Sequence, residues 1–168
     1  RVAALDFGSS FFRRNESVEV PNDNKLLMEP VSNDYAKRIK SVFSFSERLA
    51  NQVCAFSKEE GVVPIVIAGD HSSAIGVASG IKMAHPDKRL GIIWIDAHAD
   101  LHSPFTSPSG NMHGMPIAAI IDEDNLENQI NKPNEETIEY WNKIKNIGGI
   151  HPKVHPKDIV MVSVRDFE

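Results

Sequence analysis

Asp and His, residue types that commonly bind divalent metal ions, occupy alternate positions within residues 94–103 (W-I-D-A-H-A-D-L-H-S). Asp96, His98 and Asp100 directly follow an apolar run, residues 91–95. In a helix, residues two apart point to roughly opposite sides, whereas in an extended segment they share one face. Because residues 91–95 are rich in Ile and Trp and carry no charge, they predict a central strand covered on both faces. We therefore expect the three side chains to point in the same direction at the end of a buried strand.

Helical and strand patterns alternate around this segment. Asn33 or Asp34 is expected to cap the first helix, Gly61 to end it, and Ser72 and Ser73 to cap the second. The predicted helices cover residues 33–60, 72–85, 116–121 and 135–147, and the predicted buried strands cover residues 62–68, 91–95 and 159–164. This alternation is typical of an α/β fold with a parallel sheet and right-handed crossovers.

Polar residues follow each of the three predicted strands, at residues 69–71, 96–100 and 165–166. In open parallel sheets, ligands bind at the carboxyl ends of the strands, so these three groups are expected to meet in one pocket. Carboxylates and imidazoles together suit Mn²⁺, with Fe²⁺, Co²⁺ or Zn²⁺ as competitors, and the lack of nearby Cys disfavours a structural zinc site. Two such ions sharing a water make hydroxide at neutral pH, which is a hydrolytic site.

Composition limits the other possibilities. The 168 residues carry 18 Lys and Arg against 23 Asp and Glu, a net charge of -5 with no basic stripe, which disfavours nucleic acid and anionic membranes as partners. No apolar stretch is long enough for a bilayer span, and residues 1–6 do not resemble a signal peptide. The lone Cys54 fits a cytoplasmic protein. The length fits a single domain, residues 1–168, with residues 1–33 expected to be mostly loop, and the sequence leaves homo-oligomerisation open.

Three segments carry a resemblance to a known family. Residues 68–72 (A-G-D-H-S), 94–100 (W-I-D-A-H-A-D) and 109–114 (S-G-N-M-H-G) resemble three successive motifs of the ureohydrolases, the family of arginases and agmatinases. The third motif is similar to arginases more than to agmatinases. The resemblance implies a three-layer α-β-α fold, a site for two Mn²⁺ ions, and hydrolysis of L-arginine to L-ornithine and urea by attack of hydroxide on the guanidinium carbon.

The resemblance also implies roles for the metal-binding residues. His71 and Asp100 resemble ligands of one manganese ion, His98 resembles a ligand of the other, and Asp96 resembles a bridge between them. The resemblance also places Asp100, together with His113, among the catalytic residues.

Other positions match residues that handle protons or substrate. His113 resembles the histidine that shuttles protons or positions the guanidinium end, and Ser109 and Asn111 resemble residues that bind the α-carboxylate of a small guanidino substrate. Asp166 and Glu168 fall where the family places acidic groups near the α-amino end. Asp166 also has a simpler interpretation, as an ion-pair partner of Arg165 or a turn cap.

Two features depart from the family pattern. His102 stands where arginases commonly carry an Asn that contacts the substrate carboxylate, and no Asp-x-Asp motif follows a predicted strand later in the 168 residues. The acidic run 122–124 comes too early to replace that motif. We therefore expect the chain on its own to bind metal weakly.

Three functions remain open from the sequence. The chain starts without Met and ends just after a predicted strand, so we expect it to be part of a longer arginase-type enzyme. A second hydrolase interpretation is an agmatinase or a formiminoglutamase-type enzyme. The alternative of another class is a non-catalytic α/β binding module that lacks the second half of the metal site.

Overall fold

The computed structural model describes residues 17–22, 25, 28 and 30–165. Four α-helices and two β-strands occur in these residues. Their order is α1 (Ile39–Ser57), α2 (Ala74–Ala84), β1 (Ile92–Ile95), α3 (Pro116–Ile121), α4 (Glu135–Lys145) and β2 (Ile159–Val162). Short 3₁₀ turns cover His71–Ser73, Met112–Gly114, Leu126–Asn128, Ile147–Gly149 and Pro156–Asp158. No helix of the described residues is both long and apolar enough to cross a bilayer.

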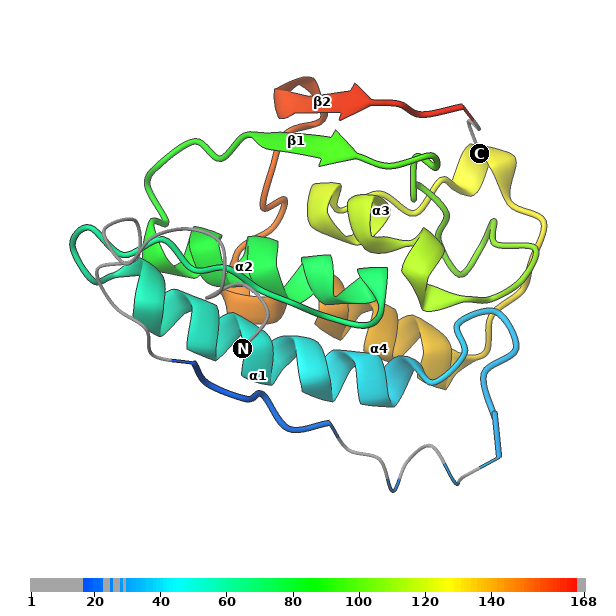
Figure 1. Ribbon diagram of the computed structural model, residues 1–168. Helices are drawn as coiled ribbons and strands as arrows, with labels where there is room; N and C mark the ends of the chain where they lie inside the picture. Colours follow the sequence, from blue (N-terminus) through cyan, green and yellow to red (C-terminus); the bar gives the residue numbers. More distant parts are fainter. Residues whose placement is uncertain (1–16, 23–24, 26–27, 29, 166–168) are drawn as a thin grey trace.

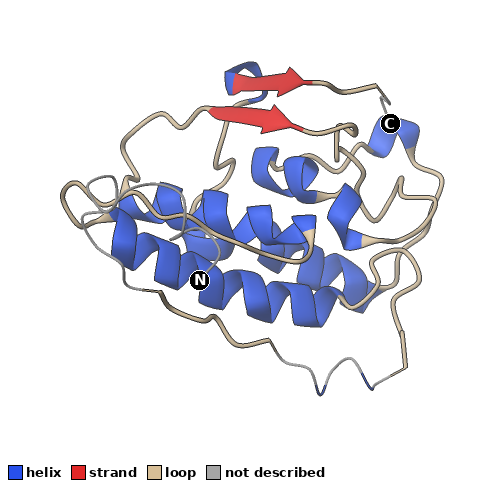
Figure 2. Cartoon of the chain, in the orientation of Figure 1, coloured by secondary structure: helices blue, strands red, loops and turns tan. Residues whose placement is uncertain are grey.

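The two strands form a parallel sheet, as the sequence predicts. Ile92 pairs with Ile159 and Ile95 with Val162 at the two ends of the register. The four α-helices lie on one side of the strands, with α2 and α3 between the sheet and the pair α1 and α4 (Figure 1). Figure 2 shows how much of the chain between these elements is loop. The α/β class with a parallel sheet is therefore confirmed.

Helices α1 and α2 approach each other closely because two glycines of α2 face α1. A Cβ atom at Gly80 would lie 2.6 Å from the carbonyl oxygen of Ala50, and one at Gly76 would lie 2.8 Å from that of Ser46. Real Cβ atoms do not approach a backbone oxygen so closely, so a side chain at either position would push the helices apart. This packing holds the start of α2, and the turn before it, firmly against the helical layer.

The helix predicted for residues 33–60 is shorter than expected at its start. It begins at Ile39, after Arg38 in the left-handed region with φ of 59°, so neither Asn33 nor Asp34 caps it. The buried amide of Asn33 instead donates a hydrogen bond to Oγ1 of Thr137, at 3.0 Å, on α4. Asn33, a residue type that often caps helices, therefore makes a long-range contact here. The local sequence pattern alone does not show which of these two roles an Asn has.

The predicted cap of the second helix was also wrong. Residues 71–73 form a 3₁₀ turn before α2, and the side chain of Asp70 accepts a hydrogen bond from the backbone N–H of Ser72 at 2.9 Å. The cap therefore lies two residues before Ser72, because the first turn of this element is 3₁₀ and not α-helical.

The predicted buried strand at residues 62–68 is contradicted. This segment has no strand pairing, and Val63 and Ile67 are 83% and 81% exposed. A strand exists only through hydrogen bonds to a neighbour, and no neighbouring strand among the described residues pairs with it. Apolar composition predicts that a segment favours burial, but it does not identify the partner that buries it.

The strands β1 and β2 are covered on one face, not on both as predicted. Trp94 on β1 is 6% exposed and faces the helices, whereas its neighbours Ile93 and Ile95 are 71% and 73% exposed. On β2, Val160 is 59% exposed. Alternating side chains of a strand point to opposite faces, so helices on one side of the sheet bury only every second residue.

Lys153 is a buried lysine whose ammonium group donates hydrogen bonds to backbone carbonyls. It is 2% exposed, and its Nζ donates hydrogen bonds to the carbonyl oxygens of Lys145 and Ile150. Burial lowers the pKa of Lys153 to about 8, against an opposing effect of Asp122. Between this value and the usual 10.5, the unfolded chain binds more protons than the folded chain.

We therefore expect the Lys153 contribution to make the chain more stable as the pH rises from about 8 to 10.5. The gain is up to about 3 kcal/mol in the free energy of unfolding. In Lys153→Met this part of the pH dependence disappears, because no proton is left to release. Urea unfolding of both proteins across this pH range measures the difference, and parallel pH profiles would contradict the assignment.

Candidate metal centre

His71 reaches the centre from the 3₁₀ turn His71–Ser73 at the start of α2. The carboxylate of Asp70 holds this turn, accepting hydrogen bonds from the backbone N–H and the hydroxyl of Ser72. The hydroxyl of Ser73 donates to the carbonyl oxygen of Asp70 at 2.7 Å. The position of His71 is therefore set by short-range hydrogen bonds on both sides of it.

Asp96 and Asp100 reach the centre from the chain that leaves β1. The backbone N–H of Asp96 donates to the carbonyl oxygen of Val162 at 3.2 Å, which continues the pairing with β2 for one residue. Oδ1 of Asp96 then accepts from the backbone N–H of His98 at 2.9 Å, so the chain turns at this point. Asp100 lies in the left-handed region with φ of 51°. The segment is thus bent and not extended through residue 100, which corrects the expected strand geometry.

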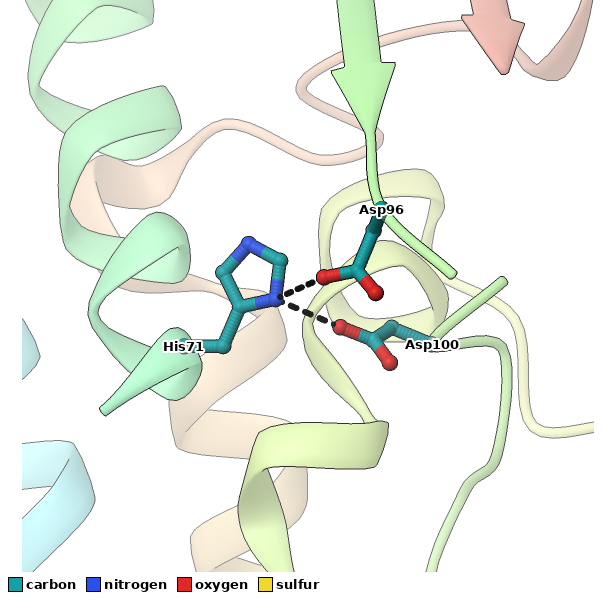
Figure 3. A group of neighbouring side chains, drawn as sticks. All are labelled: His71, Asp96 and Asp100. Carbon is teal, nitrogen blue, oxygen red and sulfur yellow. Dashed lines mark ion pairs between the residues drawn. The ribbon is translucent and has the colours of Figure 1, made fainter. Parts of the chain in front are cut away.

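The turn brings Asp96 and Asp100 to the same atom of His71. Nδ1 of His71 lies 3.0 Å from Oδ2 of Asp96 and 2.9 Å from Oδ2 of Asp100. Figure 3 shows the imidazole edge directed at both carboxylates. The Asp100 side chain is 6% exposed and that of His71 is 40% exposed, so the group lies between the interior and solvent.

Local hydrogen bonds favour the ionised form of Asp96. The N–H group of His98 lowers the pKa of the Asp96 carboxyl, burial opposes this effect, and the neighbouring His71 and His98 lower it further. A carboxylate that stays ionised near neutral pH is the form that coordinates a cation.

The donor set fits a divalent metal ion. One ligand atom each from His71, Asp96 and Asp100 lie within 4.8 Å of one another. One imidazole nitrogen with carboxylate oxygens is a set that Mn²⁺ and other first-row divalent ions accept. Three protein ligands leave coordination positions for further ligands or water, as hydrolytic sites require.

His98 and His113 lie beside this group without joining it. Nδ1 of His98 is 3.5 Å from Oδ1 of Asp96, and its side chain is 51% exposed. His113 lies on the turn Met112–Gly114, which packs against the turn that carries His71. Its Nδ1 is 3.9 Å from Oδ2 of Asp70. The structure therefore brings both histidines to the edge of the centre.

The loop between β1 and α3 carries the positions predicted to contact substrate. Nδ1 of His102 lies 3.2 Å from Oγ1 of Thr106. The Ser109 hydroxyl accepts a hydrogen bond from the backbone N–H of Asn111 at 3.2 Å. Asp166 and Glu168 lie outside the described residues. The third predicted strand end does approach the second, since the backbone N–H of Arg165 donates to the carbonyl oxygen of Ala97 at 3.0 Å.

Two residues that position His71 were not among the predicted site residues. Trp94 stacks on the imidazole of His71, and Asp70 caps the turn that carries it. The alternation along β1 contained a signal for the first, because Trp94 is two residues before Asp96 and shares its side of the strand. Nothing in the local pattern indicated that this face would meet His71.

Comparisons with known proteins agree on one family. The model of the Arginase family matches residues 9–168. Human arginase-1 is 36% identical over 153 residues, which cover 89% of this chain and 39% of the human protein. Arginase of Bacillus subtilis is also 36% identical over 153 residues, covering 90% of this chain and 45% of the bacterial protein.

Solved structures give the same result. Bacillus caldovelox arginase has a TM-score of 0.66 at 34% sequence identity, covering 84% of this chain and 41% of that one. Entamoeba histolytica arginase, solved in complex with L-ornithine, has a TM-score of 0.65 at 28% identity, covering 83% and 41%. The chain thus spans about 40% of the length of these relatives. Family model, relatives and structural neighbours together show that the chain belongs to the arginase family.

Proposed function

We propose that this chain supplies one wall of a manganese-dependent arginase site that hydrolyses L-arginine to L-ornithine and urea. The observation that carries the proposal is the convergence of His71, Asp96 and Asp100 on one point at the carboxyl end of β1. Membership of the arginase family supports the choice of reaction and of metal. We also propose that residues 1–168 are part of a single arginase-like domain, and that the protein acts in the cytoplasm.

In this proposal, four residues hold the metal ions. His71 and Asp100 would hold one Mn²⁺, His98 would hold the other, and Asp96 would contact both. When bound, the ions would supply hydroxide chemistry at neutral pH for hydrolysis of a guanidinium group. The exposed edge of His98 suits a ligand to a second ion, because its imidazole is not enclosed by its own chain.

Other residues bind the substrate and move protons. His113 is 57% exposed beside the centre, where an imidazole can pass a proton between the reacting groups and solvent. Ser109 and Asn111 bind the α-carboxylate of the substrate, and His102, in the same loop, is a further substrate-binding residue in this proposal. Asp166 and Glu168 receive the α-amino end in this proposal.

Hydrolysis of arginine, agmatine and formiminoglutamate with Mn²⁺ by the whole protein that contains this chain tests the proposal, with urea measured for the first two substrates and formamide for the third. We expect arginine to be the preferred substrate, and Asp96→Ala or His98→Ala to lower urea release by about 100-fold or more. Asp87→Ala, at an exposed turn position, is the matched control and should keep full activity.

Two outcomes would contradict the proposed function. Full activity in Asp96→Ala and His98→Ala would show that these residues do not form the reaction site. Mn²⁺ binding by the whole protein without hydrolysis of any of the three substrates would favour the non-catalytic binding module.

A further inference from the structure

The indole of Trp94 lies nearly flat against the imidazole of His71. The two ring centroids are 4.3 Å apart and the ring planes differ by 15°. The contact joins two elements that are separate in the sequence, because Trp94 belongs to β1 and His71 to the turn before α2. A near-parallel stack at this distance is an attractive aromatic arrangement.

The stack restricts the orientation of the His71 ring plane, on which metal binding depends. An imidazole coordinates through a lone pair in its own ring plane, so the orientation of that plane decides where the ligand atom points. Rotation about the last side-chain bond of histidine is broad and weakly restricted by its own backbone. A wall on one ring face restricts this rotation and leaves the ring edge, with Nδ1, free to meet Asp96 and Asp100.

Trp94 is held rigidly enough to act as such a wall. Its backbone pairs with Met161 in the sheet, and its side chain is 6% exposed. The His71 side chain is 40% exposed, so its own surroundings leave it much freer than Trp94. The enclosed Trp94 ring therefore sets the orientation of the more exposed His71 imidazole.

A second observation indicates that the aromatic face matters at this position. The Nε1–H group of Trp94 is buried and has no hydrogen-bond partner among the described residues. Burying an indole N–H without a partner is unfavourable, and a purely apolar side chain would avoid it. An apolar side chain in place of Trp94 would avoid this cost but would lose the stack on His71.

We propose that Trp94 is a positioning residue that orients the His71 imidazole, with Nδ1 toward Asp96 and Asp100, for binding of a divalent cation. This inference rests on the proposed metal site and adds a residue that does not itself touch the ion. Residues that orient metal ligands typically change metal affinity by about 10 to 100-fold when they are replaced.

Mn²⁺ affinity of Trp94 variants in the whole protein that contains this chain tests the inference, measured by the electron paramagnetic resonance signal of free Mn²⁺. We expect Trp94→Leu to bind Mn²⁺ about 10-fold more weakly than the unaltered chain. Trp94→Phe keeps a flat aromatic face and should stay within about 3-fold. Trp141→Phe is the matched control, because Trp141 is a fully buried tryptophan whose Nε1 donates to Asp124 and which does not contact His71.

The stack itself is measured without metal. In the unaltered chain and in Trp141→Phe, the ring protons of His71 should show an upfield NMR shift from the indole, and in Trp94→Leu this shift should disappear. In Trp141→Phe, Trp94 is the only tryptophan of residues 1–168, and its fluorescence should fall as Mn²⁺ binds at His71.

The outcomes separate this inference from the proposed function. Equal Mn²⁺ affinity in Trp94→Leu and the unaltered chain would overturn the positioning role alone, and so would an unshifted His71 resonance in the unaltered chain. If Trp94→Leu does not fold, a large loss of affinity in the folded Trp94→Phe protein would overturn the role of the aromatic face. Absence of Mn²⁺ binding by the unaltered whole protein would overturn the metal site and the inference with it.

Discussion

Asp100→Asn is expected to lower the Mn²⁺ affinity of the whole protein that contains this chain by at least about 100-fold, since changes outside the ligand shell alone reach that size. The Asp100 side chain is 6% exposed and its Oδ2 lies 2.9 Å from Nδ1 of His71, so it is the most enclosed of the three clustered ligands. Asparagine removes the negative charge that attracts the cation and leaves a neutral oxygen, a weaker ligand for a hard divalent ion.

This substitution is a clean test because it preserves the backbone. Asp100 has a φ of 51°, a conformation that Asn adopts more readily than other residues with side chains. The backbone carbonyl of Asp100, which accepts a hydrogen bond from Ile117 at the start of α3, is untouched. A loss of binding can therefore be assigned to the carboxylate.

Calorimetric titration with Mn²⁺ measures the effect, with unfolding curves to show that the variant remains folded. Asp87→Asn removes a negative charge from an exposed turn and serves as the control for net charge. Binding by Asp100→Asn with the affinity of the unaltered chain would mean that the cluster of His71, Asp96 and Asp100 is not the metal site.

The elements that the sequence predicted well are those whose signals are local. Helix α4 begins after Asn134, whose side chain accepts from the backbone N–H of Thr137, and α3 begins at Pro116. Caps and an N-terminal proline act within one turn, so the sequence contains all the partners that matter. The convergence of His71 with Asp96 and Asp100 was also expected, but from two strand ends. Only the second strand forms, and the 3₁₀ turn His71–Ser73 carries the imidazole instead.

The features that the sequence could not predict depend on distant partners. The apolar segment 62–68 is exposed because no described strand pairs with it, and Ile93 and Ile95 are exposed because the helices lie on the other face of β1. His98 was expected to point with Asp96 and Asp100, but the hydrogen bond between Asp96 and the His98 backbone bends the chain. Alternation predicts a shared face only while the segment stays extended.

Gly110→Ala is expected to lower the free energy of unfolding by about 2 to 5 kcal/mol, the largest stability effect that we predict for a single methyl group. Gly110 has a φ of +68°, and a Cβ atom there would lie 1.9 Å from the carbonyl oxygen of Asp34. Its own carbonyl accepts a hydrogen bond from the backbone N–H of Lys37 at 2.7 Å, and its N–H donates to Oγ of Ser107 at 2.9 Å. The glycine therefore joins the loop of Ser109 and Asn111 to the chain that enters α1.

Gly61→Ala separates the two causes of this loss of stability, the strain of the left-handed backbone and the steric clash of the added methyl group. Gly61 has a φ of +74°, close to that of Gly110, but no atom lies within 4 Å of the position that its Cβ would occupy. It should show only the strain of the left-handed conformation, about 1 to 2 kcal/mol. Urea unfolding of both variants measures the difference, and equal losses would show that the loop moves aside without penalty. A larger loss in Gly110→Ala would mean that the glycine between Ser109 and Asn111 is required by the approach of residues 34 and 35, whatever substrate the loop binds.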